Sequence, residues 1–277
     1  SLKELFPGYK NGMKFENNVI NLDYQNGNYK ISGDSELNVN EDIDSLSYSI
    51  EKKKDQIFFK TDLKLKSNAL NLELLNYTKK KGIKSNLIIE GVVNKNNSVF
   101  LNKINFAESK NFIKVKNINL NSKKKLKRID QIDVDLVNNN DQISQLNIKR
   151  KKSNYSINSK IFDGAKILDR ILFSKSEGNF FDVFEKLNSK ISINFNTIYI
   201  TNEDYLNSFK ADIIVNNNQI KDLILSSQFS TKEDLKLSIK TNSNNEKITD
   251  LFAGNAKPLV KKYDFIKGFE NGYLKFD

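Results

Sequence analysis

The sequence predicts a mainly β protein, built as a long antiparallel sheet of about fifteen strands with two or three short helices. Three observations predict this class. Apolar and polar residues alternate along most of the chain, which is typical of strands with one wet face and one buried face. Clusters of Asn and Gly separate the alternating segments. Proline, which removes a hydrogen-bond donor from a strand ladder, occurs only twice.

The N-terminal part, residues 1–160, is predicted to be an antiparallel β-repeat region. Tyr29–Val39 alternates through most of its length, and Leu70–Leu74 and Ile132–Leu136 repeat the pattern, so each is predicted to be one strand. Asn and Gly tolerate the left-handed backbone of hairpin loops. Turns are therefore predicted at residues 26–28, 94–97, 138–141 and 216–218.

A short helical insertion is predicted at residues 161–188. In Gly164–Phe173, four aliphatic side chains fall on one helical face, and Phe180–Leu187 is compatible with a further turn or two of helix. The insertion separates the repeat region from a C-terminal β module at residues 189–277.

The C-terminal module carries an apolar stripe on successive predicted strands. Because side chains two residues apart share a face, Ile191, Ile193 and Phe195 are predicted to lie on the same face as residues of the next strand. The stripe, which is also the candidate ligand-binding surface, comprises Ile191, Ile193, Phe195, Phe209, Ile213, Val215, Leu223, Leu225, Leu235, Leu237 and Ile239.

A second helical segment is predicted from Asp250 to Tyr263. Thr249 or Asp250 is a suitable N-cap, and Pro258 suits the first turn of a helix that runs toward Tyr263. Gly268 and Gly272 are predicted at turn or bulge positions beyond it.

The net charge of +11 comes from Lys, since Arg occurs only three times. Asn, Lys and Ile are abundant throughout, as an AT-rich genome would dictate, and the alternative is an anionic membrane or lipid partner. The Lys clusters are interpreted as solvated hairpin tips and edge protection rather than as a specific binding patch. They occupy Lys52–Lys54, Lys79–Lys81, Lys123–Lys125 and Lys149–Lys152. Nucleic-acid binding, which relies on Arg forks and stacked aromatics, is not expected.

Catalysis is not expected. The chain contains neither His nor Cys, which excludes the Ser-His-Asp and Cys-His nucleophile arrangements and metal sites that require these ligands. Asp133 and Asp135 alternate with apolar residues, so they are assigned to the wet face of a strand rather than to an active site. No catalytic residue, metal site or cofactor is therefore predicted.

The C-terminal stretch resembles a signature of the AsmA-like family, which includes TamB-type and YhdP-type bridging proteins. In that family an Asp-Ala-Gly begins a short helical segment that ends at a Gly-containing turn into a strand. Here the family's Asp is replaced by Phe252. The matching positions are Ala253, Gly254, Tyr263, Asp264, Gly268 and Gly272. The strand-to-helix step Ser159–Gly164 is similar to the step before the last β module of the family.

The resemblance implies a non-catalytic segment of a periplasmic protein of a Gram-negative bacterium. Such a protein would be anchored in the inner membrane by a helix outside this sequence, which is expected to be part of a longer chain. Its sheet would curl into a groove that binds phospholipid acyl chains and conducts them toward the outer membrane, with outer-membrane or periplasmic proteins as further partners. The alternative is a structural β-sandwich or β-solenoid of a cell-envelope scaffold or surface protein.

Overall fold

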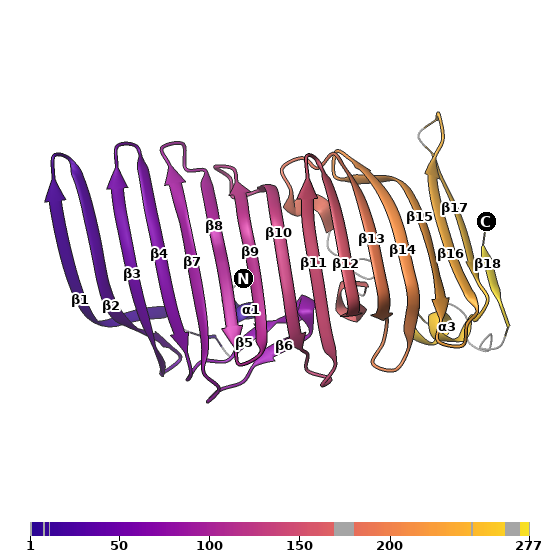
Figure 1. The fold of residues 1–277 in the computed structure, drawn as a ribbon, viewed down its shortest axis with the longest axis horizontal. Coiled ribbons are helices and arrows are strands. Elements are labelled where there is room, and N and C mark those ends of the chain that lie inside the picture. Colours follow the sequence, from indigo (N-terminus) through magenta and orange to yellow (C-terminus); the bar gives the residue numbers. More distant parts are fainter. Residues whose placement is uncertain are drawn as a thin grey trace. The chain divides into compact units, whose positions relative to one another are not determined.

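The computed structural model describes residues 2–7, 9–10, 12–168, 180–244, 246–263 and 272–276. Its main sheet has sixteen strands that follow one another in chain order, and a second sheet has two (Figure 1). The predicted mainly β, mostly antiparallel architecture with short helices is confirmed. The chain divides into two compact units, residues 1–142 and 143–277, which are described in turn.

Unit 1 is an antiparallel meander. Its main-sheet strands are β1 (Met13–Gln25), β2 (Asn28–Val39), β3 (Asp42–Lys53), β4 (Gln56–Leu65), β7 (Ser85–Asn94), β8 (Val99–Glu108), β9 (Asn111–Leu120) and β10 (Leu126–Val137). Each strand pairs antiparallel with the next. At the β1–β2 turn, Asn26 and Gly27 have φ values of 49° and 79°, the left-handed geometry predicted for this hairpin.

A small cap lies over one end of the unit 1 sheet. It consists of α1 (Leu2–Leu5), β5 (Leu70–Leu72), the 3₁₀ turn η1 (Glu73–Leu75) and β6 (Tyr77–Lys79). Leu70–Leu74 was predicted as one strand, but β5 ends at Leu72. The chain reverses at Asn76, whose φ of 47° is left-handed, so that β6 can pair with β5. The Tyr77 ring packs edge-on against the Phe106 ring of β8, with 5.9 Å between the ring centres. This contact packs the cap against the main sheet.

Unit 2 continues with β11 (Ile143–Lys151), β12 (Asn154–Asp163), β13 (Ser189–Tyr199), β14 (Tyr205–Asn216), β15 (Gln219–Phe229), β16 (Asp234–Thr241), β17 (Lys247–Ala253) and β18 (Leu274–Phe276). Its helical elements are the 3₁₀ helix η2 (Phe180–Val183) and α3 (Lys257–Tyr263), with a helical turn at residues 165–168. The helical character predicted in the insertion is therefore present in these described parts, and residues 169–179 lie outside the described residues.

The strands on either side of this insertion are neighbours. β12 and β13 pair in parallel, with Tyr155 opposite Ile191 and Phe162 opposite Ile198. The boundary between the units at residues 142 and 143 consequently differs from the predicted one at 160 and 161. The prediction relied on the change of local pattern, whereas the parallel pairing holds β12 in the same unit as β13.

The prediction of helix from Asp250 onward is wrong for its first seven residues, 250–256. Residues 250–253 belong to β17, where Leu251 pairs with Leu237 of β16 and Ala253 pairs with Leu235. Asp250 accepts a hydrogen bond from the Ser238 hydroxyl across the strands at 2.9 Å instead of capping a helix. Helix begins only at α3, whose second residue is the proline expected in a first turn.

Candidate apolar binding face

The predicted apolar stripe lies on one face of unit 2. Ile191 of β13 is opposite Ile213 of β14, which is opposite Leu223 of β15, which in turn is opposite Ile239 of β16. Residues directly opposite each other in an antiparallel pair project to the same face. The prediction that the β13 and β14 stripe residues share a face is thus confirmed, and the row extends across four strands.

A second row runs beside the first. It joins Ile193, Ala211, Leu225, Leu237 and Leu251, each directly opposite the next. Adjacent strands lie about 4.8 Å apart, so the two rows form a continuous apolar track perpendicular to the strands.

Aromatic residues continue the face toward the other end of β13. The Phe195 ring stacks on the Phe209 ring, with 5.9 Å between the ring centres, and its centre lies 5.6 Å from that of the Phe162 ring of β12. After Phe195, strict alternation would make residue 197 the next inward residue of β13, but the buried residue is Ile198. β14 has a register shift between residues 207 and 210, where Ser208 has a φ of 51°, and such a bulge moves the inward positions by one residue.

The opposite face of these strands is polar. Asp212 accepts a hydrogen bond from Ser192 at 2.6 Å and pairs with Lys190 at 3.4 Å. The Ser192 hydrogen bond is the main reason that the pKa of Asp212 lies below its ordinary value. Ile214 and Ile224 are exceptions, with 45% and 59% of their surface exposed on this polar face.

The apolar face of unit 2 is buried at its ends and half-exposed between them. At one end Phe181 of η2 and Leu187 are buried with Tyr155, Ile191 and Val215 in one hydrophobic cluster. The residues around α3 are also buried, including Ala253, Ala256 and Val260. Between these ends Ala211 and Leu223 are buried as well. The half-buried residues of this face include Ile193, Phe209, Ile213, Leu225, Leu237 and Ile239.

Unit 1 carries an equivalent apolar row that the sequence interpretation did not single out. One residue from every main-sheet strand of unit 1 lies directly opposite a residue of the next strand. The row consists of Leu22, Ile31, Ile50, Phe59, Gly91, Leu101, Ile118 and Ile129. All are half-buried except Leu22, which is exposed, and Gly91, above which Phe59 and Leu101 meet. The same period-2 alternation could have identified this row.

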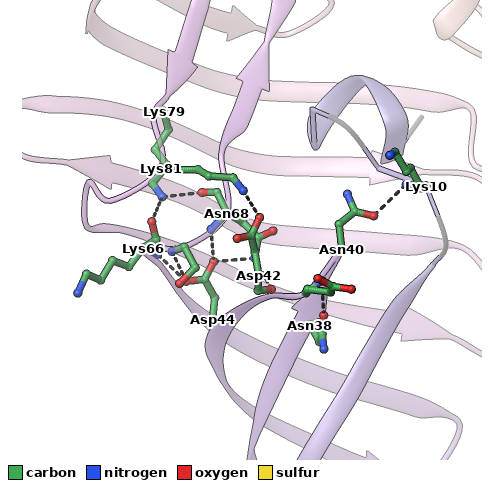
Figure 2. Close-up of polar contacts among 11 residues, drawn as sticks. Lys10, Asn38, Asn40, Asp42, Asp44, Lys66, Asn68, Lys79 and Lys81 are labelled. Atoms are coloured by element: carbon green, nitrogen blue, oxygen red, sulfur yellow. Dashed lines mark hydrogen bonds and ion pairs between the residues drawn. The ribbon is translucent and has the colours of Figure 1, made fainter.

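The cap of unit 1 is held by a buried carboxylate (Figure 2). Asp44 accepts hydrogen bonds from the backbone N–H groups of Lys66, Ser67 and Asn68 at 2.6, 2.7 and 2.9 Å, and from the Asn68 side chain at 2.9 Å. Burial raises the pKa of the Asp44 carboxyl, but these hydrogen bonds outweigh burial and place the pKa below its ordinary value.

Lys79 lies beside this carboxylate and is fully buried (Figure 2). Its Nζ donates to the carbonyls of Lys66 and Asn68 at 3.0 and 2.6 Å. Burial lowers the pKa of Lys79, although Asp44 acts in the opposite direction. The interpretation of Lys79–Lys81 as a solvated hairpin tip is therefore wrong at Lys79, because β6 points this side chain inward to satisfy turn carbonyls.

A polar hollow of about 620 Å³ adjoins the cap. Its lining includes Lys10, Asn38 and Asn40, and Lys81 pairs with Asp42 at its side (Figure 2). Polar groups line it, so this hollow suits water or a small ion better than an acyl chain.

The residues of the C-terminal motif are partly described. Ala253 is fully buried at the end of β17. A Cβ at Gly254 would lie 2.8 Å from Cβ of Glu233, so the backbone there passes close to the preceding hairpin. Gly272 has a φ of 111°, in agreement with its predicted turn position. Tyr263 ends α3, while Asp264 and Gly268 lie outside the described residues.

The described residues contain no cluster of three or more acidic, His or Cys side chains that could hold a metal ion. Within the same residues, none of the helices has the length and apolar character needed to cross a membrane. No family model, curated protein or solved structure shows significant similarity to the chain.

Proposed function

We propose that this chain is a periplasmic segment of an AsmA-like protein that binds phospholipid acyl chains on its apolar sheet face and conducts them between the inner and outer membranes. The observation that carries the proposal is the set of directly opposed apolar rows that cross successive strands in each unit. In this proposal the chain acts without catalysis, and the sheet curls around the lipid.

The half-buried state of these rows supports the proposal. An isolated sheet face of this composition would be stabilised by a cover. The cap of unit 1 and the helical elements of unit 2 bury only part of each face. At about 0.8 kcal/mol per buried CH₂, an acyl chain of ordinary length would gain on the order of 10 kcal/mol on such a surface.

The similarity of neighbouring positions favours conduction over storage. Ile213, Leu223 and Ile239 succeed one another in one row, and Leu225 and Leu237 occupy the next. An acyl chain that shifts by one strand would exchange one aliphatic contact for another of nearly equal free energy. The barrier to sliding along the row would therefore be low.

Adjacent residues of β15 provide a matched test. Leu225 is half-buried on the apolar face, and Ile224 is exposed on the polar face. A photo-crosslinking amino acid at Leu225 should capture phospholipid in cells, and the same group at Ile224 should not. Phe195 is a poorer position, because it is buried against its aromatic neighbours.

Equal labelling at the two positions, or none at either in a folded protein, would contradict lipid binding on this face. Crosslinks from Leu225 to protein rather than lipid would favour the structural scaffold role.

A further inference from the structure

The hairpin tips at one edge of unit 1 form a basic surface. The β1–β2, β3–β4, β7–β8 and β9–β10 connections all lie at the same ends of their antiparallel strands, at the top of Figure 1. We define the basic rim as residues 23–30, 51–57, 93–99 and 120–128. It includes two of the Lys clusters, Lys52–Lys54 and Lys123–Lys125.

The positive charge of unit 1 is concentrated at this edge. The basic rim contains ten Lys or Arg and three Asp or Glu, a difference of seven positive charges. The connections at the opposite edge, residues 40–42, 66–84, 108–111 and 137–142, contain six Lys and five Asp or Glu. An excess of Lys caused only by an AT-rich genome would not by itself give the two edges such different net charges.

The tips are joined to one another laterally. Three contacts link them in order: the Lys54 N–H donates to Asn28 Oδ1 (3.3 Å), Lys95 Nζ pairs with Asp55 (3.2 Å), and Lys124 Nζ donates to the Asn97 carbonyl (2.7 Å). These contacts hold four separate hairpins as one continuous row of charge.

Aromatic side chains accompany the lysines. Tyr24 has 72% of its surface exposed at the end of β1. Lys52 Nζ lies 5.8 Å from the Tyr29 ring centre, and Lys53 Nζ lies 5.9 Å from that of Phe58. Tyr and Lys together are typical of surfaces that contact the headgroup region of a bilayer, where an amphipathic ring and a snorkelling amine are both accommodated.

We propose that the basic rim is a docking surface for a bilayer that contains anionic phospholipids. Lys amines are compact, strongly hydrated charges that suit lipid phosphates, and the rim contains a single Arg, Arg128, which is half-buried. This docking does not depend on acyl chains occupying the apolar face.

Flotation of the full chain with vesicles tests the docking. Binding should be strong with vesicles of phosphatidylcholine and phosphatidylglycerol, weak with phosphatidylcholine alone, and should fall as salt is added. The triple variant Lys123→Glu, Lys124→Glu, Lys125→Glu should bind the anionic vesicles at least about a hundredfold more weakly, since each basic residue near such a surface contributes about fivefold to the affinity.

The matched control reverses three exposed lysines at the opposite edge: Lys80→Glu, Lys84→Glu and Lys110→Glu. Both triple variants change the net charge from +11 to +5, because each substitution replaces a positive charge with a negative one. The control should retain most of the binding. Equal loss in the two variants would show that only total charge matters and would overturn the proposal.

A fluorescent reporter distinguishes docking at the rim from adhesion elsewhere. The chain has no Trp, so Tyr24→Trp places a single indole at the rim and Ile43→Trp places one near the opposite edge. Anionic vesicles should shift the emission of the first to the blue and leave the second unchanged. A shift at Ile43→Trp alone, or displacement of the protein by inorganic phosphate at the concentration of the lipid phosphate, would overturn membrane docking at this rim.

Discussion

At the scale of single residues, unit 1 depends on two buried charged side chains that look like ordinary surface residues in the sequence. Asp44 accepts four hydrogen bonds from the 66–68 turn, and Lys79 donates to two carbonyls of the same turn. Buried charges are retained in proteins only where such partners satisfy them. The pair therefore fixes the cap on the end of the apolar face.

Asp44→Asn should lower the free energy of unfolding by about 1–3 kcal/mol. The amide oxygen of Asn accepts hydrogen bonds more weakly than a carboxylate does. The Asn NH₂ group would also face backbone N–H groups, which are themselves donors and cannot accept its hydrogen bonds. Chemical denaturation would measure the change. Asp55→Asn is the control, because its carboxylate lies in an exposed ion pair on a hairpin tip, and it should change stability by less than about 0.5 kcal/mol.

The Asp44 contribution should also depend on pH. Folding lowers the pKa of this carboxyl from its ordinary value of 3.8. Such a group contributes stability that is present above the unfolded-state pKa and is lost as the pH falls through the folded-state pKa. The difference in unfolding free energy between the wild type and Asp44→Asn should therefore be largest near neutral pH and shrink below pH 3.8. A difference that grows on acidification would contradict the assignment.

At the scale of elements, each strand of the apolar track presents one apolar and one polar side, with β15 as the clearest case. Leu223 and Leu225 face the track, while Asp222 and Ser226 project to the other side. The exposed Ile224 shows that hydrophobicity alone does not decide which face a residue occupies. Alternation along the whole strand and pairing with both neighbours decide it.

Leu225→Asp should destabilise unit 2 by several kcal/mol, because it places a charge among the apolar side chains opposite it, Ala211 and Leu237. Ile224→Asp adds the same charge one residue away on the polar face and should change stability by about 0.5 kcal/mol or less. Urea denaturation of the two variants would measure the difference. Similar losses would indicate that the two faces do not differ as the register requires.

At the scale of the whole molecule, the proposed function predicts that long apolar ligands stabilise the fold. Single-chain phosphocholine lipids below their micelle concentration should raise the thermal midpoint, since a ligand that binds only the folded state stabilises it. Each added CH₂ should strengthen binding roughly fourfold, which corresponds to about 0.8 kcal/mol. A midpoint that does not vary with chain length would indicate that the apolar rows do not accept acyl chains.

The strands and turns of this fold were predictable because they follow from local patterns. Period-2 alternation identified the strands, and Asn-rich stretches identified hairpins such as Asn217–Asn218, where both φ values are positive. The shared face of Ile191 and Ile213 followed from the same alternation, because a register that buries one apolar residue of a strand buries the others two residues away.

The sequence by itself thus determined the β class and the apolar side of most strands. Only the tertiary structure decided that residues 250–253 pair with β16 rather than form a helix, that β12 and β13 are parallel, and that Lys79 is buried beside Asp44. The physical reason is range. Backbone periodicity is a property of neighbours along the chain, whereas strand partners, caps and buried charges are selected by residues that are distant in sequence and meet only after folding.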